Sequence, residues 1–116
     1  MTGNVLVGDV EGRVALLVDD LIGTGTTMAR AARACVGAGA TEVLALATHG
    51  LFLEGAREVV EDPALSRVLV TNTVPPFRLD PELVRRKVEV VDAAPLVAEA
   101  IRRINEGGSL VELLEA

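Results

Sequence analysis

The chain has 116 residues, which is enough for one hydrophobic core and a single domain over residues 1–116. Half of the residues are hydrophobic but only two are aromatic, so the core must be aliphatic, as is typical of parallel α/β proteins. A net charge of −6 argues against a nucleic-acid-binding protein, and the single cysteine excludes an intrachain disulfide and makes the cytoplasm the expected compartment.

In the first half of the chain, aliphatic runs alternate with a helical pattern. Residues 4–7 are predicted to be a short strand or an arm, and residues 14–18 (VALLV) a strand buried on both faces. Residues 19–26 are predicted to be a loop. A helix with Cys35 on its buried side is expected over 27–36, ended by Gly37 and Gly39. No apolar run reaches the roughly 18 residues of a membrane span, and the first residues do not resemble a secretory signal, so no membrane partner is expected.

The second half repeats this alternation. Strands are predicted over 43–47, 68–71 and 88–91, with a short helix over 55–62. Three prolines between residues 72 and 81 exclude a central strand there. Asp92 is expected to cap a last helix, ended by Gly107, whose buried face is Leu96, Val97, Ala100, Ile101 and Ile104. A last turn or short helix follows over 109–114. The order β-α-β-α-β-β-α predicts a three-layer α/β/α fold around a mostly parallel sheet.

The segment 14–27, VALLVDDLIGTGTT, is the candidate site. Ligands of parallel α/β sheets bind beyond the carboxyl ends of the strands, where Asp19 and Asp20 are expected. The loop that follows opens directly into a helix, so its amides, its hydroxyls and the helix dipole favour a phosphate. A sugar phosphate would complement both halves. These loop residues are Gly23, Thr24, Gly25, Thr26 and Thr27. In the purely structural alternative, the acids cap a loop and Thr26 caps the helix.

These residues resemble the phosphoribosyl-pyrophosphate signature of type I phosphoribosyltransferase-fold proteins. The segments GDVEGRVALLVDD, THGLF, VTNTVP and KVEVVDAAPLVAEAIRRI resemble the C-terminal part of ribose-phosphate pyrophosphokinase, in order and over almost the whole chain. The resemblance therefore implies a partial type I phosphoribosyltransferase-like fold and a C-terminal domain portion without the N-terminal domain.

The resemblance implies a kinase-type transferase of nucleotide biosynthesis. ATP gives its β,γ-diphosphoryl group to ribose 5-phosphate, forming phosphoribosyl pyrophosphate and AMP with Mg²⁺. By position, Asp19 and Asp20 would engage the ribose hydroxyls, directly or through Mg²⁺, and the residues from Gly23 to Thr27 would hold the 5-phosphate. The resemblance also implies a homo-oligomer.

The chain departs from the family pattern. The family usually has Asp where this chain has Gly23, and the Lys/Arg loop that neutralises the transferring phosphates has no counterpart here. We therefore expect a fragment that binds a sugar phosphate but is inactive alone. Because residues 14–18 would pair with a missing strand, they are expected to form an exposed edge or to pair with another chain. A non-catalytic associated homologue and a nucleobase phosphoribosyltransferase stay open as alternatives.

A few other polar residues are expected near the site or in the core. His49 follows a strand end, where fixing a loop by a hydrogen bond is favoured over contact with phosphate or Mg²⁺. Thr71 and Thr73 end the third strand near the expected cleft. Cys35 is interpreted as a packing residue.

Overall fold

The computed structural model describes residues 8–115, and the predicted strand or arm over 4–7 lies outside them. Four parallel strands form one sheet in the order β1-β2-β3-β4. The strands are β1 (Val14–Ile22), β2 (Glu42–Gly50), β3 (Arg67–Thr71) and β4 (Val88–Val91). The helices are α1 (Thr26–Gly37), α2 (Ala56–Glu61), α3 (Pro81–Lys87), α4 (Ala94–Glu106) and α5 (Leu110–Glu115). The predicted parallel α/β fold is confirmed.

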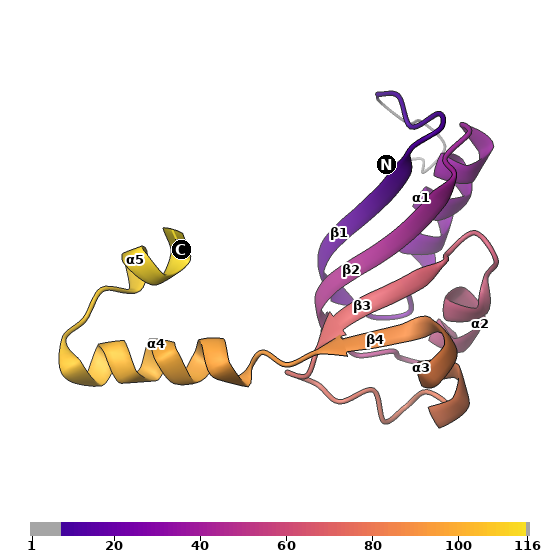
Figure 1. Ribbon diagram of the computed structural model, residues 1–116. Helices are drawn as coiled ribbons and strands as arrows, with labels where there is room; N and C mark the ends of the chain where they lie inside the picture. The colour runs from indigo at the N-terminus through magenta and orange to yellow at the C-terminus, as the bar shows by residue number, and fades with distance from the viewer. Residues whose placement is uncertain (1–7, 116) are drawn as a thin grey trace.

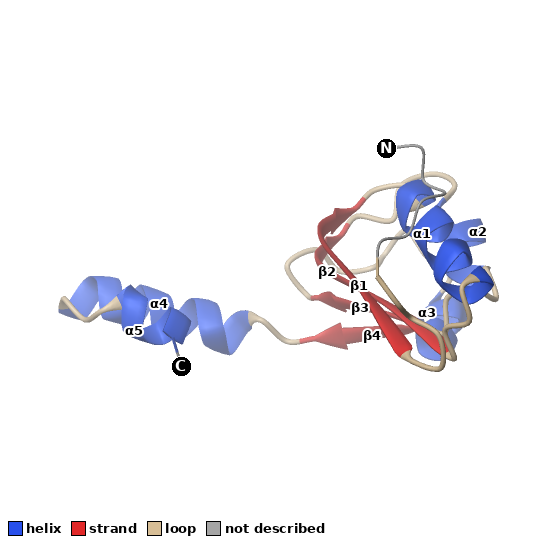
Figure 2. Cartoon of the chain, turned by 90° about the horizontal axis from the view of Figure 1, so that it is seen from above, coloured by secondary structure: helices blue, strands red, loops and turns tan. Residues whose placement is uncertain are grey.

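The helices α1, α2 and α3 cover one face of the sheet only (Figures 1 and 2). The core lies between these helices and the sheet, because side chains alternate along a strand and every second one points to the helices. Val43, Ala45, Val68 and Val70 are buried there. Cys35 of α1 is buried in the same core, as its interpretation as a packing residue requires.

The prediction of a third layer is wrong within the described residues. The opposite face of the sheet, here called the open face and defined by Leu16, Val18, Leu46, Leu69 and Val91, carries no helix (Figure 2). The helix α4 was expected to cover a core, but it extends away from the sheet, and its large aliphatic side chains are exposed. The run over 14–18 is accordingly buried on one face at most.

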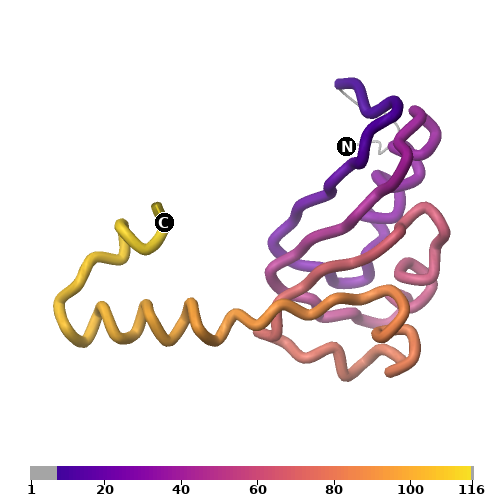
Figure 3. Tube along the Cα trace, viewed as in Figure 1, coloured from indigo at the N-terminus to yellow at the C-terminus, as the bar shows by residue number. Residues whose placement is uncertain are grey.

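The extension of α4 and α5 dominates the shape of the chain (Figure 3). The radius of gyration is 16.4 Å, whereas a compact chain of this length has about 13 Å. The strand β1 lies at the edge of the sheet, as predicted for residues 14–18. Two hydrophobic surfaces and one strand edge are thus left without a partner among residues 8–115.

The helix α3 was not predicted, because the prolines around it indicated a loop. Its start is nevertheless well marked: the Asp80 carboxylate accepts a hydrogen bond from the Glu82 amide at 2.9 Å, and Pro81 occupies the first helical position. Leu83 of this short helix is fully buried against the sheet. Asp–Pro followed by Glu was the sequence signal for this helix.

Asp62, just after α2, ties α2 to α1. Its carboxylate accepts from the Ala64 amide at 2.9 Å and from the Arg33 guanidinium at 2.6 Å. The backbone hydrogen bond of Ala64, followed by the hydrogen bond and charge of Arg33, lowers the pKa of Asp62 below its ordinary value. The ionised form is therefore the one that the folded state prefers.

We expect Asp62 to make stability depend on pH in the acid range. Since its pKa is lower in the folded state than in the unfolded state, its contribution is present above the unfolded value of 3.8 and is lost as the pH falls through the folded value. Urea unfolding of the wild type and of Asp62→Asn at neutral and acid pH measures this. The free-energy difference between the two proteins should shrink in acid; an equal difference at both pH values would contradict the assignment.

Candidate phosphate-binding site

The strand β1 is longer than predicted and carries both candidate acids within the sheet. Asp19 pairs in register with Ala47, and Ile22 with Gly50, so the expected loop over 19–26 begins only at Gly23. Neighbouring side chains of a strand point to opposite faces. Asp19 has the same parity as Ala15 and Leu17, which pack against the core under the helices, whereas Asp20 has no register partner in β2 and its amide donates to Asp19 Oδ1 at 2.8 Å.

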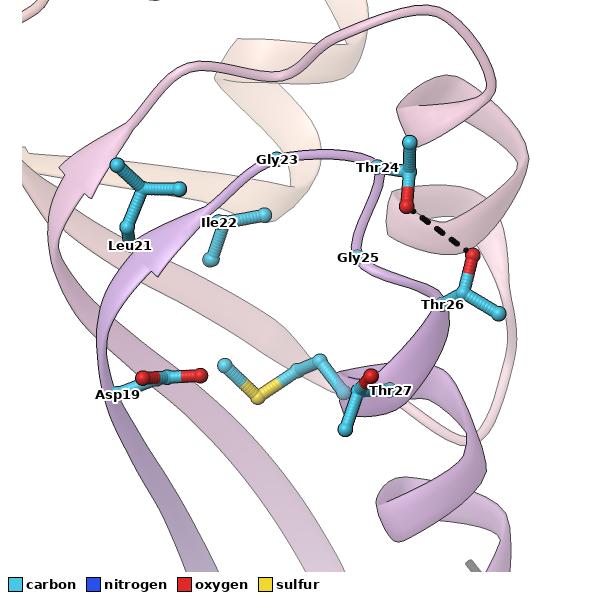
Figure 4. Close-up of a pocket in the computed structure, with 9 residues that line it drawn as sticks. Asp19, Leu21, Ile22, Gly23, Thr24, Gly25, Thr26 and Thr27 are labelled. Atoms are coloured by element: carbon cyan, nitrogen blue, oxygen red, sulfur yellow. Dashed lines mark hydrogen bonds between the residues drawn. The ribbon is translucent and has the colours of Figure 1, made fainter.

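A hollow of about 240 Å³ lies between the end of β1 and the start of α1. Asp19 lines it, and Asp20 does not. Figure 4 shows the Asp19 carboxylate pointing into the space that the loop encloses. All five predicted loop residues line the same hollow: Gly23, Thr24, Gly25, Thr26 and Thr27. The structure thus brings six of the seven predicted residues together in one lining, and Asp20 is not part of it.

The helix α1 begins with free amide groups. The residue before its first turn is Gly25, with φ of +81°, and no side chain caps the helix start. Thr26 lies inside the helix, so the alternative in which Thr26 caps it is wrong. The first-turn amides of an α-helix have no partner within the helix, and the helix dipole adds positive potential at this end. No acidic residue lies in this first turn to neutralise that potential.

The threonine hydroxyls extend this donor set. The Oγ1 atoms of Thr24 and Thr26 are 3.1 Å apart and hydrogen-bonded to each other, as the dashed line in Figure 4 marks. Hydroxyls rotate to suit their partner, so this pair can redirect a proton towards an anion. The loop therefore offers backbone amides and hydroxyls to a bound anion without any basic side chain in the lining.

The segment 51–53 holds the loop in place through backbone hydrogen bonds. The Leu51 amide donates to the Ile22 carbonyl at 3.0 Å, and the Leu53 amide donates to the Gly23 carbonyl at 2.9 Å. These bonds occupy the carbonyl oxygens of the loop, which would repel an anion. The sequence pattern did not predict this supporting role, although the segment THGLF resembles the family.

Phe52 anchors this support and lies in an unusual conformation. Its φ is +50°, although it is not a glycine, and its ring is fully buried. A Cβ added to Gly50 would lie 2.6 Å from Cε2 of Phe52 and 2.8 Å from Cγ1 of Val70, so only glycine fits there. The buried ring holds a strained backbone in place beside the loop.

Replacing Gly50 with alanine is expected to destabilise the fold by about 1–3 kcal/mol, the usual range for overpacking a core. Gly37→Ala is the matched control, since a Cβ at Gly37 meets no atom within 4 Å and alanine favours the helix. Denaturant unfolding of the two variants measures the difference. Equal stability of both variants would show that the ring of Phe52 moves aside freely.

The polar residues at the other strand ends interact with each other. The His49 Nδ1 atom lies 2.7 Å from Oγ1 of Thr73, and the Thr71 hydroxyl donates to the Thr48 carbonyl at 2.6 Å. His49 thus makes the loop-fixing hydrogen bond that was predicted for it. None of these residues lines the hollow between β1 and α1, but Thr48 and Thr71 line a second hollow together with Asp19.

Comparison with known proteins identifies the family. The sequence matches the phosphoribosyl synthetase-associated domain over residues 3–115. The chain belongs to this family. It is 45% identical over 108 residues to a ribose-phosphate pyrophosphokinase of Aquifex aeolicus and 44% identical over 106 residues to ribose-phosphate pyrophosphokinase 2 of Saccharomyces cerevisiae, covering 93% and 91% of this chain.

A solved structure shows the same fold as this family member. The phosphoribosylpyrophosphate synthetase of Mycobacterium smegmatis superposes with a TM-score of 0.76 and 36% identity over 88% of this chain. The chain spans about a third of the length of these relatives, namely 33%, 32% and 33%. Within residues 8–115, no helix is both long enough and apolar enough to cross a membrane.

Proposed function

We propose that this chain supplies the ribose-5-phosphate-binding part of a ribose-phosphate pyrophosphokinase. In this proposal the chain is the C-terminal portion of a type I phosphoribosyltransferase-like fold. The whole protein would transfer the diphosphoryl group of ATP to ribose 5-phosphate, giving phosphoribosyl pyrophosphate and AMP. The observation that carries the proposal is the hollow in which the Asp19 carboxylate faces the donors of the loop from Gly23 to Thr27.

The two sides of the hollow would bind the two parts of a sugar phosphate. The 5-phosphate would accept hydrogen bonds from the loop amides and from the hydroxyls of Thr24, Thr26 and Thr27. The ribose hydroxyls would donate to the Asp19 carboxylate. Asp20, which was expected beside Asp19 in the site, does not line this hollow. Holding the sugar in one orientation is the main contribution that such a site makes to phosphoryl transfer.

The hollow could supply one carboxylate ligand to Mg²⁺. No group of three or more His, Cys, Asp or Glu side chains gathers within residues 8–115, so the chain alone forms no closed metal cage. Mg²⁺ in phosphoryl-transfer sites usually needs only one or two carboxylates, because substrate phosphates and waters complete its shell. Asp19 would supply such a carboxylate, and the ion would supply charge neutralisation to the phosphates.

A non-catalytic associated homologue is the second candidate, and the lining of the hollow favours it. No basic side chain lines the hollow, whereas developing phosphate charge requires neutralisation. Gly23 also stands where the family usually has Asp. A Cβ at Gly23 would meet its nearest atom, Cδ1 of Leu53, at 3.6 Å, so Gly23→Asp is sterically allowed.

Calorimetric titration with ribose 5-phosphate tests the proposal. Thr27→Val should weaken binding several-fold, because it removes a hydroxyl donor from the hollow. Thr41→Val is the matched control, since Thr41 is exposed and lies outside the hollow. Equal affinities of the two variants, or no heat with the wild type, would overturn the site. Release of AMP from ATP by the purified chain would favour the enzyme over the associated homologue. Intact binding of ribose 5-phosphate without release of AMP would favour the associated homologue.

A further inference from the structure

The peptide group between Leu51 and Phe52 is held at both of its ends. Its N–H, the Phe52 amide, donates to the Ile22 carbonyl at 3.3 Å. Its carbonyl oxygen, that of Leu51, accepts a hydrogen bond from Nη1 of Arg78 at 3.2 Å. Fixing the plane of this peptide group helps to fix the next backbone rotation, which is the φ of +50° at Phe52. A strained φ persists only where the surrounding structure determines it from several sides, and Arg78 provides one of them.

The connection between β3 and α3 fixes Arg78 itself. Leu79, the next residue, has its side chain buried in the core. The carbonyls of Pro75 and Pro76 accept hydrogen bonds from the amides of Phe77 at 2.8 Å and of Leu79 at 3.3 Å. The guanidinium of Arg78 lies over the ring of Phe77, with Cζ 4.4 Å from the ring centroid, a distance at which the ring attracts a cation. Both the backbone and the charged end of Arg78 are therefore held.

Arg78 acts on the phosphate hollow only through the segment 51–53. It does not line that hollow; together with Phe52 it lines a separate one of about 280 Å³. The Ile22 carbonyl, which accepts from the Phe52 amide, belongs to the peptide group that also contains the Gly23 amide. Gly23 lines the phosphate hollow. Two peptide groups thus connect the guanidinium to the first residue of the loop.

This connection has a positional effect and a smaller electrostatic one. Each hydrogen bond in a chain of peptide groups polarises the next, by roughly 10–30% per bond, so a cation at one end favours an anion at the other. That matters because no basic side chain lines the phosphate hollow. The larger effect is that the Leu51 and Ile22 carbonyls stay engaged, which keeps the loop in the conformation that forms the hollow.

We propose that Arg78 is a positioning residue of the phosphate loop, which it holds through the peptide group between Leu51 and Phe52. This inference rests on the proposed function, because it takes the loop from Gly23 to Thr27 as the part that binds phosphate. Arg78 lies between the segments 70–75 and 87–104, which resemble the family, and belongs to neither of them.

Arg78→Met tests the inference, because methionine keeps an unbranched side chain and removes the charged donor. Calorimetric titration should show that it binds inorganic phosphate and ribose 5-phosphate about three- to tenfold more weakly than the wild type. Both ligands should lose affinity alike, since Arg78 acts on the end of the site that holds the phosphate. Arg78→Lys keeps a charged donor and should lie between the wild type and Arg78→Met.

Arg57→Met is the matched control. Arg57 lines the same separate hollow as Arg78, but it pairs with Glu61, with Nε 3.5 Å from Oε1, instead of with the segment 51–53. Its affinities for both ligands should stay within about twofold of the wild type, because exposed charges are screened by salt. Equal losses of affinity in Arg57→Met and Arg78→Met would show a general effect of positive charge and overturn the inference.

Hydrogen exchange of the ligand-free chain gives a readout that does not depend on binding. The amides of Phe52 and Leu53 should exchange faster in Arg78→Met than in Arg57→Met or the wild type, because the segment opens more easily, while the core amide of Val43 stays unchanged. Unchanged exchange at Phe52 and Leu53 would overturn the inference. Faster exchange with unchanged affinities would also overturn it but leave the proposed function standing. A wild type that binds neither ligand would overturn both.

Discussion

Replacing Gly25 with alanine is expected to lower the free energy of unfolding by about 2–4 kcal/mol and to abolish detectable binding of ribose 5-phosphate. Two costs add at this position. Its φ of +81° lies in the region that costs an L-residue about 1 kcal/mol or more. A Cβ would also lie 2.8 Å from Cγ1 of Val59 on α2, and overpacking of this kind costs about 1–3 kcal/mol. The loop must move to relieve the contact, which displaces the first-turn amides of α1.

Gly55→Ala is the matched control for this prediction. Gly55 also precedes a helix with a positive φ, of +93°, but a Cβ there meets no atom within 4 Å. It should therefore show the backbone cost alone and keep its affinity for ribose 5-phosphate. Thermal unfolding and calorimetric titration of both variants give the comparison. If Gly25→Ala binds as well as Gly55→Ala, the loop geometry does not hold the phosphate.

The two adjacent acids are expected to differ sharply when each is neutralised. Asp19→Asn should weaken the binding of ribose 5-phosphate by tenfold or more, because hydrogen bonds to a charged group contribute about 1.5–3 kcal/mol. Asp20→Asn should change the affinity by less than about threefold, since Asp20 does not line the hollow. Asparagine keeps the shape of the side chain in both cases.

Inorganic phosphate serves as the second ligand in this experiment. It occupies only the loop end of the site, so Asp19→Asn should leave its affinity unchanged or raise it slightly, because a negative charge is removed. Equal losses of ribose 5-phosphate binding in the two variants would show that both acids face the substrate. A loss of phosphate binding in Asp19→Asn would indicate a general disturbance of the loop.

The difference between the two acids illustrates what the sequence did not reveal. Asp and Gly are poor strand formers, so the pattern predicted a loop after residue 18. The strand β2 continues to Gly50, and its ladder keeps β1 extended as far as Ile22. Within this continued strand Asp19 lines the hollow beside α1 and Asp20 does not. Tertiary pairing decided the geometry of the site, and the residues themselves did not.

The helix α4 is the second element whose surroundings the sequence did not predict. Its aliphatic residues were predicted to form a buried face, whereas the large ones are exposed in the structure. Periodicity shows which side of a helix avoids water, but it does not show whether the covering surface belongs to the same molecule. The parallel sheet and the loop from Gly23 to the start of α1 were predictable because short-range patterns determine them, namely aliphatic runs and glycines before a helix.

The most direct test of the central claim is to observe the loop amides while ribose 5-phosphate binds. In a ¹H–¹⁵N correlation spectrum of the chain, the largest shifts should fall on the amides from Gly23 to Met28, which line the hollow. Ribose without phosphate should leave these amides almost unchanged. Shifts concentrated elsewhere, or equal shifts with ribose alone, would contradict the assignment of this loop as the phosphate site.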